Sequence, residues 1–493
     1  MLLRRAAVVA VFMVSVSAYG QAFLPAAPSE RCTVAPANIG TPAMWLDRAA
    51  ARVLPASMEG KVLRVRATHD SPLWEQSDRS YEPFIPNASE TVRWFDPQTN
   101  VEARNSPLRP VTPAQYPAQL QSLTGSFAGR DTAVRANAAF FPFGAVYMRL
   151  NPWSVLVDWR AHASDARVTQ RCVYRDYSRV VLERGGERLY LTESDGVPIK
   201  LERTEPHYLF GQVKAEYVWN TWWVVRGGGL YPYAAFLLFD GTTYQRVGVA
   251  SGTAQLIPID SAPRLTLPSA SPMNDRLVIG AASPDTVRID DHTFQLITPA
   301  YTETVTLQRD TVFLLDATSG EARARFDSTW IAKLFPGKHA VTLVVTDLAW
   351  PHISSVRFWV ARGATVVSHR TSEDFIRRVV ARKWTLEPDA LEKARATSTL
   401  RFRAIDDSLR LAGGRVVIYA MRGNTTEGAL GVWLADSKYW WAGDYVQPDA
   451  GSPYYFDVVR TVRGLGLEPV KVGSQHSKLL DWKDVESRVP AGK

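Results

Sequence analysis

The chain has 493 residues, of which 22% are charged, and a formal net charge of +8. This length is enough for two to four domains with their own cores. The basic excess is small for so long a chain, and Lys and Arg are neither gathered into blocks nor interleaved with a binding motif. The charge pattern therefore argues against a nucleic-acid partner.

The first twenty residues have the pattern of a secretory signal peptide. Arg4 and Arg5 precede an apolar run at residues 6–16, and small residues at positions 18–20 fit cleavage before Gln21. The run is shorter than the ~20 residues that span a bilayer, so we disfavour the alternative of an uncleaved membrane anchor. We expect a mature chain with no stable membrane span that is periplasmic or secreted.

The chain contains two cysteines, Cys32 and Cys172. In an oxidising compartment they can form one disulfide, which would tie a Pro-rich leader at residues 21–40 to the first domain. Two unpaired thiols are the other interpretation that the sequence allows. No histidine motif accompanies either cysteine, so neither is expected to be catalytic.

Residues 41–265 form the first predicted domain. Thr41 and Pro42 are typical of a helix start, and apolar side chains at helical spacing predict a helix to about Leu54. From Lys61 onward, period-two alternation broken by turn signals predicts a run of antiparallel hairpins, one of them turning at residues 185–186. We interpret residues 118–123 as helical.

One helix followed by a long antiparallel meander resembles the half-barrel domains of bacterial lipoprotein carriers, although no motif supports the resemblance. Aromatic residues are concentrated in its later strands. They are Tyr217, Trp219, Trp222, Trp223, Tyr231, Tyr233 and Phe236. They can form a concave surface for a lipid, glycan or peptide, or they can pack the sheet. We favour the second interpretation because strands are enriched in aromatic residues.

A predicted linker at residues 266–282 leads to a second predicted domain at residues 283–493. The β-branched run 340–345 predicts a buried strand, and residues 356–362 predict the helix that follows it. Residues 373–383 form an amphipathic helix, whose Arg and Lys side chains are expected on a solvated face.

The loop between that strand and the following helix, Thr346 to His352, resembles the Thr-His-x-His-x-Asp-His signature of metallo-β-lactamase-fold hydrolases. Further segments resemble that family's motifs in the same order. They are 314–317, 362–369, 423–428, 441–444 and 473–476. The resemblance covers about the last two hundred residues and implies an αββα sandwich. The predicted fold class is therefore α+β, with an N-terminal antiparallel half-barrel-like domain and a C-terminal metallo-β-lactamase-like sandwich.

In this comparison, most of the family's metal ligands are replaced by other residues. The first-site positions are Asp347, Ala349 and Thr425. A methyl group and a neutral hydroxyl cannot replace the imidazole donors of a tetrahedral zinc site. The resemblance therefore implies that the first metal site is lost.

The second-site positions keep three donors, which we call the retained donors: His352, Asp444 and His476. Pro351 stands where the family has a carboxylate ligand. Two histidines and a carboxylate suffice for one divalent ion, most readily zinc, with an open position for water. The alternative, which we favour, is that the retained donors are remnants in a fold without metal, because Pro351 removes one ligand and stiffens the backbone beside His352.

Three functions are compatible with this sequence. We favour a non-catalytic binding protein of the cell envelope, with a small-molecule, lipid or glycan ligand. The second is a single-metal hydrolase of esters, lactams or phosphodiesters, in which the retained donors hold the ion and Asp347 or Glu427 orients or deprotonates water. The third is an envelope carrier that acts through the aromatic side chains near Trp222 and Trp223.

Overall fold

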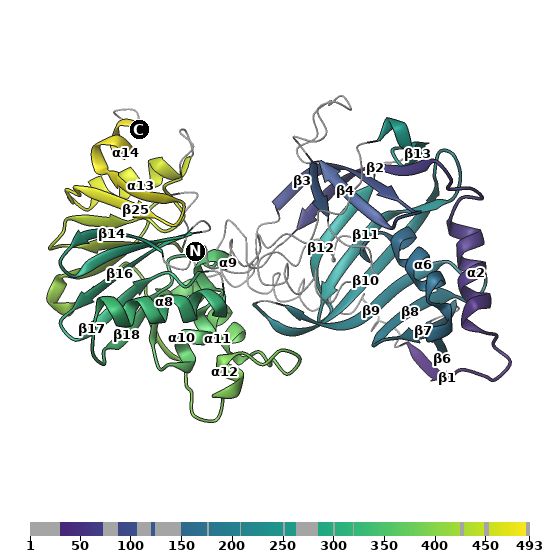
Figure 1. Cartoon of the computed structure of the whole chain (residues 1–493), viewed down its shortest axis with the longest axis horizontal. Helices are drawn as coiled ribbons and strands as arrows, with labels where there is room; N and C mark the ends of the chain where they lie inside the picture. The colour runs from purple at the N-terminus through teal and green to yellow at the C-terminus, as the bar shows by residue number, and fades with distance from the viewer. Residues whose placement is uncertain are drawn as a thin grey trace, which may run out of the picture.

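The computed structural model describes residues 30–71, 87–105, 120–123, 149–174, 177–207, 209–249, 252–262, 284–298, 301–318, 320–423, 428–447 and 453–489. The predicted signal peptide, the predicted linker at residues 266–282, and Thr425 and Glu427 lie outside the described residues. Figure 1 shows a β-rich N-terminal part and a C-terminal part with its own sheets and helices.

The N-terminal part is built on one antiparallel sheet. Its strands are β1 (Arg31–Val34), β2 (Lys61–Ser71), β3 (Asn87–Asp96), β4 (Val101–Asn105), β5 (Leu120–Leu123), β6 (Arg167–Tyr174), β7 (Tyr177–Arg184), β8 (Glu187–Thr192), β9 (Pro198–His207), β10 (Gly211–Val224), β11 (Leu230–Phe239), β12 (Thr242–Val249) and β13 (Gln255–Pro258). They pair in the order β1-β6-β7-β8-β9-β10-β11-β12-β2-β3-β4-β5, and β13 also pairs with β2. The predicted hairpin turn joins β7 to β8, where Gly185 and Gly186 both have positive φ, as a tight two-residue turn requires.

Helix α2 (Pro42–Val53), which the sequence predicts, packs on this sheet. The Thr41 hydroxyl accepts a hydrogen bond of 3.2 Å from the backbone N–H of Met44, and Pro42 occupies the first turn. The apolar face of the helix is buried. Its buried side chains are Trp45, Leu46, Ala49, Ala50 and Val53.

Two parts of the predicted N-terminal pattern are wrong. Helix α6 (Pro152–Ala161) interrupts the run of hairpins, capped by Asn151, which accepts from the N–H of Trp153 at 3.1 Å. This helix is buried on most sides, so its sequence lacks the one-sided apolar stripe that marks a surface helix. Residues 120–123, expected to be helical, form β5 and pair with β4.

The aromatic residues of β10 and β11 divide between the two faces of the sheet. Tyr217, Trp219 and Tyr231 are buried in the core with α2 and α6. Trp223 and Tyr233 are each 46% exposed, and their ring centroids lie 5.9 Å apart. The packing interpretation therefore holds for the inward-facing set, and a small aromatic surface remains at the end of the β10–β11 hairpin.

On the face of the sheet away from the two helices, Glu202 is surrounded by donors. It accepts a hydrogen bond of 2.6 Å from the Tyr190 hydroxyl and forms ion pairs with Lys214 at 2.5 Å and Arg188 at 2.9 Å. Burial raises the pKa of the Glu202 carboxyl, but these donors and the Lys200 ammonium lower it more, to about 2.

We expect Glu202→Gln to lower the free energy of unfolding by about 3 kcal/mol at pH 7. Because the folded-state pKa of Glu202 is depressed, its contribution to stability is complete above the unfolded-state pKa of about 4.5. The contribution is lost as the pH falls toward 2. Denaturant unfolding of both proteins between pH 7 and pH 2.5 measures the difference. The control is Glu216→Gln, because Glu216 lies directly opposite Glu202 on the neighbouring strand β10. This change should lower the free energy of unfolding by less than about 1 kcal/mol. A difference that does not shrink at low pH would contradict the assignment.

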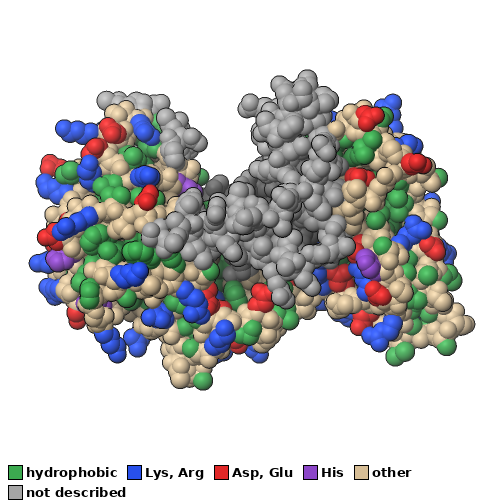
Figure 2. All heavy atoms as spheres, viewed as in Figure 1, with side chains coloured by type: hydrophobic (Ala, Val, Ile, Leu, Met, Phe, Trp, Pro, Cys, Tyr) green, Lys and Arg blue, Asp and Glu red, His purple; other side chains and the backbone are tan. Residues whose placement is uncertain are grey.

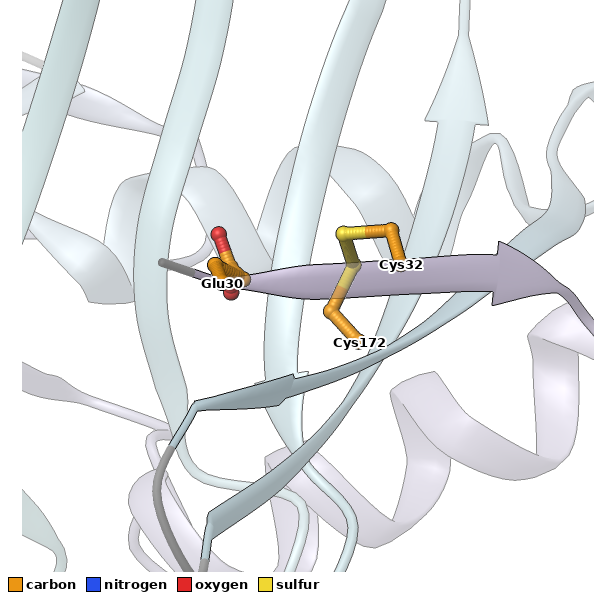
Figure 3. Close-up of side chains that lie close together, drawn as sticks. All are labelled: Glu30, Cys32 and Cys172. Atoms are coloured by element: carbon orange, nitrogen blue, oxygen red, sulfur yellow. A yellow bond between two sulfur atoms is a disulfide. The ribbon is translucent and has the colours of Figure 1, made fainter. Parts of the chain in front are cut away.

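The two cysteines form a disulfide. Cys32 on β1 lies directly opposite Cys172 on β6, and their Cα atoms are 4.0 Å apart (Figure 3). Glu30 lies beside them and pairs with Arg179 at 2.8 Å. Of the two interpretations that the sequence allows, the structure has the paired one, and the bond ties part of the predicted leader to the sheet.

The C-terminal part contains two sheets. The first comprises β14 (Asp285–Asp290), β15 (Thr293–Ile297), β16 (Thr302–Gln308), β17 (Thr311–Leu315), β18 (Ala340–Val344), β19 (Thr365–His369) and β20 (Arg401–Ile405). The second comprises β21 (Ser408–Leu411), β22 (Val416–Ala420), β23 (Leu430–Leu434), β24 (Tyr439–Trp441), β25 (Lys471–Ser474) and β26 (Ser477–Asp481). Strands β17 to β20 are parallel, so their carboxyl ends meet at one edge.

Helices cover the outer faces of both sheets. Side chains of α8 (Glu321–Leu334), α10 (Val356–Ala361), α11 (Glu373–Ala381) and α12 (Ala390–Lys393) pack with the first sheet, and those of α13 (Pro453–Gly464) and α14 (Trp482–Ser487) with the second. A separate apolar core joins the two sheets face to face. The layers are therefore helix, sheet, sheet, helix (Figure 1).

The two parts of the chain contact each other at the β9–β10 turn. The Arg382 guanidinium donates to the carbonyls of Phe210 and Gln212, each at 2.6 Å, and pairs with Asp240 at 2.8 Å. The backbone N–H of Gln212 donates to the carbonyl of Lys383 at 3.1 Å. The prediction that the Arg and Lys side chains of residues 373–383 face solvent is therefore wrong for Arg382, which binds the N-terminal part. The sequence pattern did not reveal this contact, because its partners are distant in sequence.

Lys and Arg side chains are interspersed with Asp and Glu over both parts of the chain on the face shown in Figure 2. Among the described helices, none combines the length and apolar character needed to cross a membrane.

Candidate functional site

The candidate site lies at one edge of the sandwich, where several strands end. Asp316 follows β17, Thr346 and Asp347 follow β18, Asp444 follows β24, and His476 follows β25. The two sheets meet here, because the N–H of Leu430 on β23 donates to the carbonyl of Thr346 at 2.9 Å. The loop from β18 runs through the short helix α9 (Trp350–Ile353) into α10, which is the predicted strand, loop and helix.

Asp316 is the centre of a buried hydrogen-bond network. Its carboxylate accepts from the N–H and hydroxyl of Thr346 at 2.9 and 2.8 Å and from the indole N–H of Trp441 at 2.9 Å. It also lies 3.2 Å from Nδ1 of His352. Asp316, Thr346, His352 and Trp441 are all fully buried, so this network fixes the β17 and β18 ends to the second sheet.

His352 is held on one side of its ring. Its Nδ1 faces Asp316 and the Thr346 hydroxyl, each at 3.2 Å, whereas Nε2 is buried without a hydrogen-bond partner among the described residues. Burial lowers the pKa of the imidazole, but the Asp316 carboxylate, with smaller effects of Asp444 and Asp347, raises it to about 9.

Gly443 allows the second sheet to approach this network. Its φ is +58°, and a Cβ atom there would lie 2.5 Å from the Thr346 hydroxyl oxygen and 3.9 Å from His352 Cε1. A side chain is excluded both by the backbone conformation and by the contact. The glycine therefore keeps the strand end that carries Asp444 close to His352.

Asp444 and His476 bind each other. Nε2 of His476 lies 2.5 Å from Oδ1 of Asp444, and the Tyr301 ring packs edge-on against the His476 ring with centroids 5.3 Å apart. Burial raises the pKa of the Asp444 carboxyl, but the facing His476 and His352 lower it more, so its pKa is below the ordinary value. Burial of the Tyr301 hydroxyl raises its pKa, and the negative charge of Asp444 adds to this rise.

Asp347 has different partners. One carboxylate oxygen accepts from the N–H of Ala349 at 2.6 Å, and the other accepts from the Tyr445 hydroxyl. Burial raises the pKa of the Asp347 carboxyl, although His352 and Tyr445 oppose the rise. Both oxygens of this predicted catalytic carboxylate are therefore engaged within the protein.

A buried arginine fixes the loop that carries Tyr301. Arg323 on α8 donates to the Thr298 hydroxyl at 2.6 Å and to the Tyr301 carbonyl at 3.2 Å. Its guanidinium also pairs with Asp327 at 2.8 Å and with Glu303 at 3.4 Å. The N–H of Thr302 in turn donates to the carbonyl of Gln475, next to His476, at 2.9 Å. These contacts connect α8 to the edge of the candidate site.

As they lie, the retained donors do not fit a shared zinc ion. Ligands at 2.0–2.2 Å from a tetrahedral ion are about 3.4 Å from one another, whereas Asp444 and His476 are in direct contact at 2.5 Å. Among the described residues, the one group of three donors close enough for a metal is Glu30, Cys32 and Cys172. The two sulfurs of that group are bonded to each other and are not available as thiolate ligands.

The structure brings Asp444 and His476 together and places His352 with Asp316 instead. Sequence reasoning assigned no role to Asp316, although the segment 314–317 was matched to a family motif. It also passed over Tyr301 and Tyr445. The strand-end position of Asp316 was a usable signal, but its partners come from both sheets and are not adjacent in sequence.

No protein-family model and no curated protein matches the sequence. Solved structures similar to the chain include TMB-1, described in terms of substrate and inhibitor binding, at 14% identity and a TM-score of 0.32, over 42% of this chain and 95% of that one. The DIM-1 metallo-β-lactamase is 12% identical with a TM-score of 0.33, over 42% and 95%. The metallo-β-lactamase from Pontibacter korlensis is 13% identical with a TM-score of 0.32, over 41% and 96%. The last two carry the name of the family that the motifs resemble.

Proposed function

We propose that this chain is an exported, non-catalytic binding protein of the cell envelope, with a metallo-β-lactamase fold whose metal centre has been replaced by ion pairs. The observation that carries the proposal is the pairing of the retained donors. Asp444 contacts His476, and His352 contacts Asp316, so the groups that would share an ion are engaged with other side chains. The Cys32–Cys172 disulfide supports export, because such bonds persist in oxidising compartments.

The N-terminal part supplies a second surface for a ligand. We propose that it is a half-barrel of the lipoprotein-carrier type, supported by its single antiparallel sheet with two helices packed on it. The exposed Trp223, Val224 and Tyr233 at the end of one hairpin favour an apolar lipid or glycan ligand there. Native mass spectrometry of the purified chain should then show a co-purified molecule, and its absence would count against the carrier function.

One observation favours the alternative of a single-metal hydrolase. His352 presents an unpartnered Nε2, and its Nδ1 faces a carboxylate, which is how metal-ligating histidines are oriented. A hydrolase would require His476 and Asp444 to separate and turn toward His352.

Metal analysis combined with activity assays distinguishes the two functions. We expect protein purified from zinc-supplemented cells to hold less than one zinc per chain. We also expect no hydrolysis of a chromogenic β-lactam, an aryl ester or an aryl phosphodiester above a buffer control. His476→Ala should leave both results unchanged, with circular dichroism to check folding. One tightly bound zinc per chain, together with a hydrolysis that His476→Ala abolishes, would establish the hydrolase instead.

A further inference from the structure

A cavity of about 270 Å³ lies at the edge of the sandwich opposite the candidate functional site. Thr311 and Thr365, which line it, are the first residues of β17 and β19, whereas Asp316 and Asp347 follow the carboxyl ends of strands in the same sheet. This space is large enough for several waters or for a small organic molecule.

The inner face of the first sheet changes character along its strands. Alternate residues of each strand face the second sheet, and those nearer the candidate site form the apolar core. That apolar set is Leu315, Val344, Val367 and Ile405. Toward the cavity, the same face carries a polar set, Thr311, Thr342, Thr365 and Arg403. Polar side chains at positions that a sandwich normally fills with apolar ones leave the gap between the sheets open to a polar ligand.

Two arginines give the cavity a positive charge. Arg309 and Arg403 line it, and neither forms an ion pair with another described residue. The carboxylate of Asp310 also lines the cavity and accepts from the Thr311 hydroxyl at 3.5 Å. The lining thus carries two positive charges and one negative charge. Apolar side chains, those of Phe313, Val367 and Leu411, form part of the wall.

The backbone at Arg309 is unfavourable for an arginine. Its φ is +59° in the turn between β16 and β17, a position where glycine or asparagine is usual. Its guanidinium lies against the opposite sheet, since a Cβ on Gly413 would be 2.6 Å from Nη2. A strained residue whose side chain reaches over a cavity is often retained for function.

We propose that this cavity binds a small organic anion, with its carboxylate or phosphate group between Arg309 and Arg403 and its apolar part against Phe313, Val367 and Leu411. The guanidinium groups are suited to such oxyanions, and the threonine hydroxyls supply further donors. An inorganic ion alone would leave the apolar wall without a partner. This site is independent of the function proposed for the opposite edge.

Isothermal titration of the full chain with octanoate, benzoate and phenyl phosphate tests the proposal. We expect at least one of the three to bind with one-to-one stoichiometry. Arg403→Met and Arg309→Gly should each weaken that binding at least tenfold. Arg401→Met is the matched control, because Arg401 lies on the same strand but does not line the cavity, and it should bind as the wild type does. Arg309→Gly should also unfold at the same temperature or higher, because glycine adopts the positive φ freely.

Four results would overturn the proposal. They are no binding of any of the three anions, equally tight binding of inorganic phosphate, equally tight binding of uncharged octanol, and binding that neither arginine variant weakens.

Discussion

Replacing Arg323 with methionine is expected to lower the free energy of unfolding by about 3–5 kcal/mol. The Arg323 side chain is fully buried, and its Nε donates to both oxygens of Asp327 at 2.8 and 2.9 Å. Methionine keeps much of the apolar volume but leaves Asp327 and Glu303 buried without their cation. Burial already raises the pKa of the Asp327 carboxyl, and Arg323 is the group that opposes the rise.

Denaturant unfolding followed by tryptophan fluorescence measures this loss. Arg325→Met is the matched control, because Arg325 lies on the same helix, is 58% exposed and pairs with Glu321 at the surface, so it should cost less than about 1 kcal/mol. The double variant Arg323→Met with Asp327→Leu should recover most of the loss, since it removes one of the unpaired charges as well. A single variant as stable as the control would show that the buried pair contributes little.

The Arg323 variant should also disturb the candidate site. Arg323 holds Thr298 and the Tyr301 carbonyl, and the Tyr301 ring contacts His476. Loss of these bonds frees the loop beside the Asp444–His476 pair. The imidazole NMR signals of His476 should then shift in Arg323→Met and not in Arg325→Met.

Local pattern was enough to predict the elements that carry the site. The run 340–345 is mostly apolar and β-branched, and the mainly apolar segment 356–362 is closed by Gly363, so β18 and α10 lie where the sequence placed them. The same holds for α2, where Thr41 and Pro42 define the start. In each case the determining interactions are within a few residues of the element itself.

Elements with unusual burial could not be predicted in this way. The buried positions of α8 include Arg323 and Asp327, so charged residues interrupt its apolar stripe. Helix α6 is buried on most sides, and only the sequence Asn151-Pro152 marks its start. These helices depend on partners distant in sequence, which a periodicity does not reveal.

For the candidate site, the sequence pointed to some of the residues but not to the contacts between them. The motif comparisons named His352, Asp444 and His476, which all lie at one edge of the sandwich, and their role in binding a metal stays a prediction. It could not show that His352 faces Asp316 or that Asp444 and His476 bind each other, because these contacts join strand ends from two sheets. Whether a metal site survives depends on these distances, not on the residue types alone.

Removal of the disulfide is the other change with a large expected effect. Cys32 and Cys172 are separated by 140 residues, and cross-linking so long a loop restricts the unfolded chain strongly. We expect the double variant Cys32→Ser with Cys172→Ala to lose about 2–5 kcal/mol of stability. The loss should be confined to the N-terminal part, because both cysteines belong to its sheet.

Calorimetry of the full chain measures this effect, since a molecule whose two parts have separate sheets can show two unfolding transitions. One transition should move to lower temperature in the double variant, and the wild type in the presence of a reductant should behave in the same way. Thr33→Ala is the control, because Thr33 is exposed on the same strand and its loss should cost less than about 0.5 kcal/mol. If the double variant and the control unfold alike, the bond either does not form in the purified protein or does not stabilise it, and a free-thiol assay of the wild type distinguishes these two outcomes. A thiol-free wild type with unchanged stability would mean that the ion pair of Glu30 with Arg179 and the β1–β6 pairing hold the first strand without the covalent link.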